Sequence, residues 1–193
     1  MVALSDSIRR GAIPGAEIAL VVSDKADAQG IDTARARGLK TLVIERRARK
    51  REEHESKIVS VLREEKIDLV CLAGYMRLLS PHFIAAFSGR ILNIHPSLLP
   101  SFPGLDAQQQ ALEHGVKLTG CTVHFVDDTL DGGPIIAQRV VPVLDHDTVE
   151  TLSARILEQE HLLYTEAVAL VLQNNYDVIG RRVVCNSVTA TGK

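Results

Sequence analysis

The stretch RKREEHESKIVSVLREEKIDLVCLAG, residues 49–74, contains two patterns that together indicate the class of fold. Its first part places Ile58, Val59 and Leu62 along one stripe of an amphipathic helix. Its second part, residues 67–74, is continuously apolar, which is typical of a strand that is covered on both faces of a parallel sheet. A helix followed by such a strand is the repeating unit of α/β proteins.

The same alternation extends to both sides of that stretch. Further strands are predicted at residues 17–23, 41–45 and 90–94. Helices are predicted at residues 3–11, 26–38 and 81–89, each of which ends at a glycine. From Leu118 the polarity alternates in segments 119–126 and 134–143, and a long closing helix is predicted at 148–173. We therefore predict an α/β, Rossmann-like, doubly wound and mostly parallel sheet with an antiparallel C-terminal portion.

The composition sets broad limits on the kind of protein. The chain has 193 residues, of which 46% are hydrophobic, so we expect one domain at 1–185 with a sizeable core and a disordered polar tail at 186–193. A formal net charge of −2 gives no indication of a nucleic-acid or membrane partner. Cys71, Cys121 and Cys185 are scattered, which favours a reducing, cytoplasmic compartment over a disulfide framework. We expect Cys71 and Cys121 to be core residues.

Polar side chains end the strand predicted at 90–94. Asn93 and His95 are two residues apart, so both point to the same face of the strand, at the sheet edge where α/β proteins bind ligands. Pro96 restricts His95 to an extended conformation, and Pro100 and Pro103 stiffen the segment that follows. The pattern indicates an amide donor and a titratable group on a rigid edge, although a solvated strand end would show it too.

Asp131 and His124 are the other candidate polar groups. Asp131 precedes Gly132 and Gly133, a pattern found in plain turns and also where a backbone approaches a ligand closely. A carboxylate beside His95 would hold one tautomer of its ring and favour the imidazolium. His124 alternates with Val123 and fits either a core histidine or a site residue. A metal site formed by the two histidines and Asp131 has no diagnostic spacing. The histidines expected on the surface are His54, His82, His114, His146 and His161.

Two further segments suggest ligand contacts. Residues 45–51, ERRARKR, place cations at the start of a helix, against the helix dipole, which hints at an anionic ligand such as a phosphate or a glutamate tail. Residues 75–81, YMRLLSP, follow a strand and offer backbone groups and apolar walls to a flat heterocycle, or form a simple strand-to-helix turn.

Taken together, the segments AGYMRLLSP, LNIHPSLLPSFPG, GCTVHFV and LDGGPII closely resemble the phosphoribosylglycinamide formyltransferase family, in order and in spacing, from about Val2 to Val184. The resemblance implies the transfer of a formyl group from 10-formyltetrahydrofolate, as co-substrate, to the amine of glycinamide ribonucleotide in purine synthesis. It implies small-molecule partners, a monomer or homodimer, and neither a metal nor a nucleic-acid or membrane partner.

The resemblance also implies roles for particular residues. The catalytic residues that it implies are Asn93, His95 and Asp131. The residues that it implies at the folate donor are Arg51, Met76, Arg77, Leu78, Leu79, Asn93, Asp127, Asp128, Thr129 and Leu130. The residues that it implies near the glycinamide substrate are Glu160, His124 and Pro96.

The chain departs from the family pattern at its start. The family opens with a strand and a glycine-rich loop whose amides bind the substrate phosphate, and nothing in this sequence matches them. We therefore expect the first strand of the sheet to be missing and this chain to bind the nucleotide poorly. Three alternatives share parts of the pattern. They are methionyl-tRNA formyltransferase, formyltetrahydrofolate deformylase and a non-catalytic folate-binding protein, and the basic segment 45–51 leaves a nucleic-acid module as a fourth.

Overall fold

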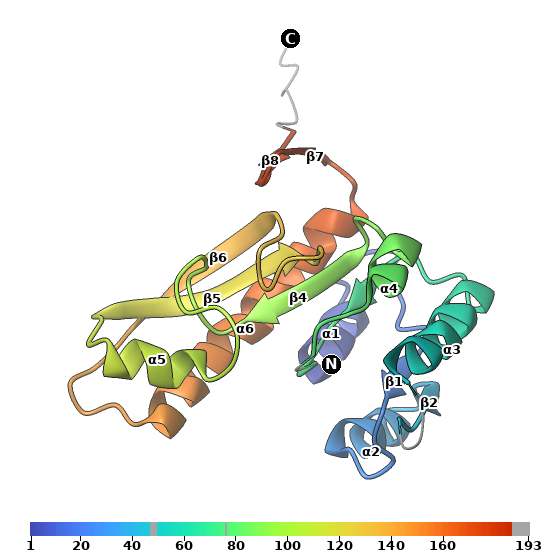
Figure 1. Cartoon of the computed structure of the whole chain (residues 1–193), viewed down its shortest axis with the longest axis horizontal. Coiled ribbons are helices and arrows are strands. Elements are labelled where there is room, and N and C mark those ends of the chain that lie inside the picture. The colour runs from blue at the N-terminus through green and yellow to red at the C-terminus, as the bar shows by residue number, and fades with distance from the viewer. Residues whose placement is uncertain (47–49, 76, 187–193) are drawn as a thin grey trace.

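The computed structural model describes residues 1–46, 50–75 and 77–186, so the predictions for Met76 and for the tail from 187 lie outside the described residues. Strand β4 (Ile91–His95) lies inside a six-stranded sheet with the strand order β3-β4-β5-β6-β8-β7 (Figure 1). It runs parallel to β3 and antiparallel to β5. The other strands of this sheet are β3 (Val70–Cys71), β5 (Leu118–Phe125), β6 (Ile135–Pro142), β7 (Tyr176–Ile179) and β8 (Arg182–Cys185).

Two further strands, β1 (Val21–Ser23) and β2 (Thr41–Val43), pair in parallel with each other in a separate two-stranded sheet. The parallel pairs β1–β2 and β3–β4, together with the antiparallel pairs β4–β5 and β5–β6, confirm the predicted α/β class.

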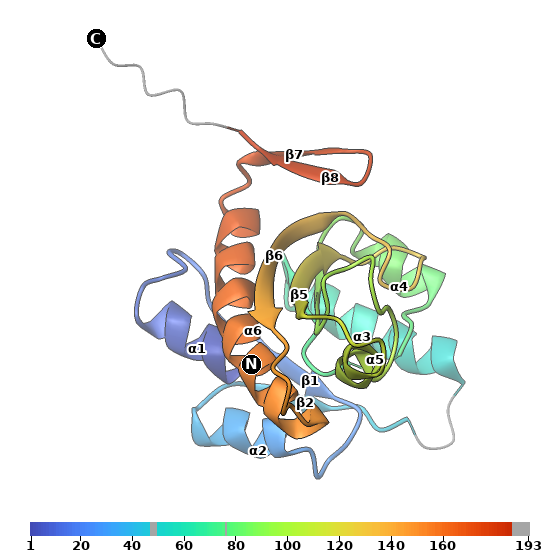
Figure 2. The same ribbon diagram turned by 90° about the vertical axis from the view of Figure 1, so that its left-hand side faces the viewer.

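Helices lie on both faces of the main sheet (Figure 2). The helices are α1 (Val2–Arg9), α2 (Gln29–Ala36), α3 (Arg51–Glu64), α4 (Pro81–Ala86), α5 (Ala107–Glu113) and α6 (Val149–Leu172). Helix α6 packs along β5 and β6 and also contacts α1 and α5, whereas α3 packs against α4. Within the described residues, no helix is long and apolar enough to cross a membrane.

Strand β4 divides the core because its side chains alternate between the two faces. Leu92 is fully buried in a cluster with residues of α1 and α6, including Leu4 and Ile156. Ile91 is buried in a second cluster with residues of α3 and α4, including Phe83. Asn93 and His95 follow Ile91 at intervals of two and therefore share its side of the sheet.

Residues 67–74 pack on both faces, as expected: Leu69 and Cys71 contact the cluster of Leu92, and Ile67, Val70 and Leu72 contact the cluster of Ile91. The structure corrects two other expectations. Of the two cysteines that we expected in the core, Cys121 is fully buried but Cys71 is only partly so. His54 was expected on the surface, yet it is buried, and its Nε2 lies 2.6 Å from the carbonyl oxygen of Ile44. That hydrogen bond satisfies the polar ring inside the fold.

Candidate active site

The candidate site begins at the carboxyl end of β4. Asn93 lies opposite His124 of β5, and His95 lies opposite Thr122. The side chain of His95 is only 6% exposed, whereas Asn93 is half-buried. The antiparallel pairing of β4 with β5 thus brings His124 beside the amide that sequence spacing had already placed next to His95.

Asp131 reaches this group from the loop between β5 and β6. One carboxylate oxygen, Oδ2, lies 3.4 Å from His95 Nδ1, and the other, Oδ1, lies 3.7 Å from His124 Nε2. Oδ2 also accepts a hydrogen bond of 2.8 Å from the amide of Gly104. The carboxylate is therefore held between two histidines and a backbone donor, and its side chain is only 11% exposed.

Both ring nitrogens of His95 face oxygen acceptors. Nε2 lies 2.8 Å from the carbonyl oxygen of Phe102, and Nδ1 faces Asp131. Phe102 adopts a left-handed backbone conformation with φ of 53°, which is uncommon for a bulky residue. A neutral imidazole carries one N–H, so only the imidazolium donates to both acceptors.

His124 orients the amide of Asn93. Its Nδ1 lies 2.8 Å from the carbonyl oxygen of Phe125, and its Nε2 lies 3.3 Å from Asn93 Nδ2. Burial lowers the pKa of His124, so the neutral ring is favoured. Its Nδ1–H then donates to Phe125, which leaves Nε2 to accept from Asn93. Of the two sequence interpretations of His124, the structure combines both: the ring is buried, and it contacts a candidate site residue.

A pH-dependent stability follows from the lowered pKa of His124. In the unfolded chain this ring has its ordinary pKa near 6.5, so below that pH the unfolded state binds a proton that the folded state resists. The stability that the neutral ring contributes is present above pH 6.5 and is lost as the pH falls through the lowered pKa. We expect His124→Gln to reduce the pH dependence of the free energy of unfolding by up to about 1.4 kcal/mol per pH unit. Urea unfolding from pH 7.5 to 5 measures this pH dependence. An equal change of the free energy of unfolding with pH in the wild type and in His124→Gln would contradict the prediction.

The loop that carries Asp131 requires two glycines. A Cβ atom on Gly133 would lie 1.9 Å from the carbonyl oxygen of Phe125, and one on Gly132 would lie 2.0 Å from Thr129 Oγ1. Asp131 itself has a φ of 48°, in the left-handed region that aspartate tolerates better than most residues. The glycines thus serve a tight turn, and the same turn aims Asp131 at the histidines.

Gly133→Ala is expected to lower the free energy of unfolding by about 1–3 kcal/mol, because the loop must move away from β5. It should also impair any activity that depends on Asp131. Gly30→Ala is the matched control, since a Cβ there meets no atom within 4 Å. Urea unfolding of both variants checks the prediction, which fails if Gly133→Ala is as stable as Gly30→Ala.

Comparison with known proteins identifies the family. A family model described as formyl transferase matches residues 1–168. The chain belongs to the formyl transferase family. It is 43% identical over 161 residues to the phosphoribosylglycinamide formyltransferase of Bacillus subtilis, covering 83% of each chain. It is also 48% identical over 171 residues to the trifunctional purine biosynthetic protein adenosine-3 of Gallus gallus, covering 88% of this chain but only 17% of that protein.

Solved structures agree with this family assignment. Glycinamide ribonucleotide transformylase 1 from Symbiobacterium toebii superposes with a TM-score of 0.92 at 52% identity, covering 95% of this chain and 86% of that one. A formyltetrahydrofolate deformylase from Pseudomonas syringae has a TM-score of 0.88 but only 27% identity, covering 95% of this chain and 61% of that one. The sequence resemblance to the formyl transferase family, and the fold that it implied, are therefore confirmed.

The other residues that the resemblance singled out lie on several elements of the formyl transferase fold. Arg51 begins α3, and the acidic Glu52 and Glu53 in the same turn complement the helix dipole that the basic segment seemed to oppose. Pro96 directly follows β4 and is half-buried. In the segment before α4, Arg77 is half-buried, Leu78 is 56% exposed and Leu79 is buried.

The loop residues 127–130 lie between the two antiparallel strands. Asp127 Oδ1 accepts hydrogen bonds of 2.9 Å from the amide and 2.5 Å from the hydroxyl of Thr129. Asp128, Thr129 and Leu130 are exposed. The loop is therefore ordered by its own short contacts while its outer side chains face solvent.

Glu160 lies on α6, and burial raises the pKa of its carboxyl. Its charge also helps raise the pKa of the Cys121 thiol on β5. The side chains of Asn93, His95, His124 and Asp131 therefore lie together. Arg51 and Glu160 lie on two other elements, the helices α3 and α6.

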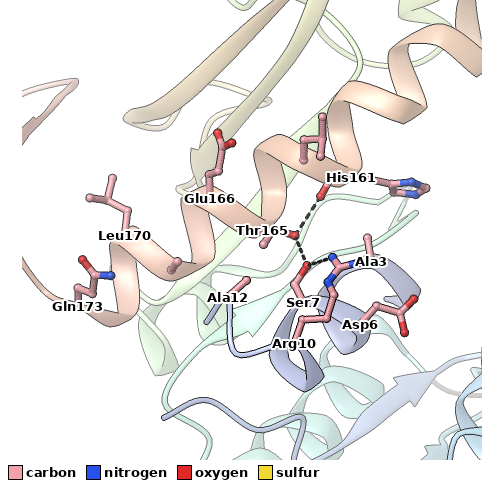
Figure 3. A pocket seen from close by; sticks show the side chains of 12 residues that line it. Ala3, Asp6, Ser7, Arg10, Ala12, His161, Thr165, Glu166, Leu170 and Gln173 are labelled. Carbon is pink, nitrogen blue, oxygen red and sulfur yellow. Dashed lines mark hydrogen bonds between the residues drawn. The ribbon is translucent and has the colours of Figure 1, made fainter. Parts of the chain in front are cut away.

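A surface hollow of about 640 Å³ lies elsewhere, between α1 and α6 (Figure 3). Ser7 Oγ and Thr165 Oγ1 are 3.1 Å apart within it, and Arg10 donates to Ser7 over 3.3 Å. None of its lining residues is among the predicted site residues. This hollow is therefore separate from the polar group at the end of β4.

Sequence reasoning missed two backbone groups and one side chain. The carbonyl of Phe102 and the amide of Gly104 hold His95 and Asp131, and the only signal for them was the proline-rich segment in which they lie. The side chain is Glu55, which is buried although it lies among charged residues that suggest a solvated helix. The signal that could have found it is helical spacing, because Glu55 lies four and seven residues before Val59 and Leu62 and so shares their buried stripe.

Proposed function

We propose that this chain transfers the formyl group of 10-formyltetrahydrofolate to the primary amine of glycinamide ribonucleotide. The observation that carries the proposal is the convergence of Asn93, His95 and Asp131 at the end of β4, in a chain whose single-function relative in Bacillus subtilis is named for this reaction. Residues 1–185 would form one formyltransferase domain, acting on small molecules in the cytoplasm.

The chemistry matches the polar groups that gather there. The neutral amine forms a bond to the formyl carbon, and negative charge develops on the formyl oxygen. Asn93 keeps a second N–H that is not used by His124, and this N–H would donate to that oxygen. One such donor is worth roughly 3 kcal/mol of transition-state stabilisation.

His95 would supply a route for the proton. When the tetrahedral intermediate collapses, the bond from the formyl carbon to N10 of the folate breaks. N10 must then take up a proton, while the attacking nitrogen loses one. The imidazolium of His95, held by Asp131, is suited to transfer that proton, directly or through water.

We assign the two substrates to different parts of the fold. Arg51 and the segment 77–79 would bind the folate donor, and the loop 127–130 would close over it. Glu160 on α6 and His124 would contact the glycinamide end of the acceptor. Pro96 would pack beside it, next to His95.

A transfer assay with three acceptors tests the proposal. Purified chain and 10-formyltetrahydrofolate are mixed with glycinamide ribonucleotide, with methionyl-tRNA, or with water alone. We expect the formyl group on glycinamide ribonucleotide. Formylated tRNA would indicate the tRNA enzyme, and free formate would indicate a deformylase like the Pseudomonas syringae protein. Tight donor binding without turnover would indicate a folate-binding protein.

A further inference from the structure

Glu55 is a buried carboxylate near the start of an otherwise charged and exposed helix. Its side chain is only 2% exposed, whereas that of Glu53, two residues earlier, is 57% exposed. An ionised carboxylate is costly to bury unless its oxygens are paired. Glu55 therefore needs specific partners, and the mechanism proposed above does not use it.

Each oxygen of Glu55 has a partner on a different segment. Oε1 accepts from Arg51 Nε over 3.2 Å, within α3. Oε2 accepts from the backbone amide of Ser80 over 2.8 Å, 25 residues further along the chain. Ser80 is itself buried and caps α4 by accepting from the amide of Phe83. One carboxylate thus joins the start of α3 to the start of α4.

The two joined segments are those that we assign to the folate donor. Among the described residues, the hydrogen bond from Arg51 to Glu55 uses Nε, so its two terminal guanidinium nitrogens can still donate to an anion. Its side chain is 42% exposed, so an anionic ligand can reach it. The amide of Ser80 directly follows residues 77–79, so its bond to Glu55 fixes the end of that segment.

We infer that Glu55 is a positioning residue: it orients Arg51 and anchors the segment 77–79, so that both meet the glutamate end and the ring system of the folate donor. The inference rests on the proposed function. Glu55 is the residue through which the two sides of the donor site are aligned.

Glu55→Gln tests the inference with little change in shape. The amide oxygen of glutamine still accepts from Ser80, but its NH₂ group then faces the Nε–H of Arg51, and two donors do not bond. We expect the KM for 10-formyltetrahydrofolate to rise about tenfold, while kcat and the KM for glycinamide ribonucleotide stay within about twofold. Glu53→Gln is the matched control: Glu53 pairs with Lys57 on the exposed side of the same helix, and its replacement should change none of these constants.

Arg51→Gln separates this inference from the proposed function. If Arg51→Gln leaves the donor KM unchanged, the donor assignment in the proposed function is wrong. If Arg51→Gln raises the donor KM and a folded Glu55→Gln does not, the positioning role alone is overturned. The double variant should be no worse for the donor than Arg51→Gln, because Glu55 acts largely through Arg51.

One further measurement and one further variant test for a general loss of structure. Thermal unfolding is recorded for every variant. If Glu55→Gln does not fold, Glu55→Asp replaces it, since the shorter carboxylate keeps the charge but cannot reach both partners. For Glu55→Asp we again expect a raised KM for the donor and an unchanged kcat. A fall in kcat together with a rise in both KM values would show a merely structural role and overturn the inference.

Discussion

Replacing His95 with alanine is expected to lower kcat/KM for formyl transfer by about 10²–10⁴-fold, the range that a positioned general acid or base contributes. The imidazole lies between the carboxylate of Asp131 and the carbonyl of Phe102, so both of its nitrogens are oriented by acceptors. Alanine removes the ring that would carry the proton between the two reacting nitrogens.

Steady-state kinetics with both substrates measures this effect, and His146→Ala is the control because His146 is exposed in a loop far along the chain from β4. Circular dichroism and thermal unfolding show whether His95→Ala keeps its fold. A folded variant with kcat/KM within tenfold of the wild type would contradict the role of His95.

The second large effect is expected at Asn93. Asn93→Ala should lower kcat by about 10²–10³-fold, the usual cost of one donor to a developing oxyanion. Because its amide also donates to His124 Nε2, alanine leaves a buried acceptor without its partner and should lower the free energy of unfolding by about 1–3 kcal/mol.

Comparison of kcat with the KM values isolates the transition-state part of this loss. Asn93→Asp gives a matched test, since aspartate has nearly the same shape but offers no N–H to the formyl oxygen. In both variants, kcat should fall by a much larger factor than the KM values rise. Normal kcat in either one would show that Asn93 does not stabilise the transition state.

The sequence predicted the parts of the fold that depend on local pattern. The apolar and polar alternation of β4 placed Asn93 and His95 on one face, and the alternation of β5 and β6 predicted strands in an antiparallel portion. The pairing of β5 with β4, which brings His124 to Asn93, was not predicted. The long helix α6 was predicted from its apolar stripe, and its first turn adds a capping box between Thr148 and Thr151.

Local sequence patterns did not predict the contacts between segments that are far apart in the chain. The approach of Asp131 to His95 depends on a tight glycine turn and on the amide of Gly104, which lies 27 residues away from Asp131. The burial of His54 depends on how α3 packs, because charged residues surround it in the sequence, whereas Glu55 shares the predicted stripe of Val59 and Leu62. Helix α5 and the hairpin of β7 and β8 were missed because they are short, with seven, four and four residues.

The most direct test of the whole account is a crystal structure of this chain with a stable analogue of 10-formyltetrahydrofolate. We predict that the oxygen corresponding to the formyl group lies within about 3.2 Å of Asn93 Nδ2 or of a ring nitrogen of His95, with the glutamate end near Arg51. An analogue bound in the hollow between α1 and α6, or with its formyl carbon out of reach of both side chains, would contradict the account.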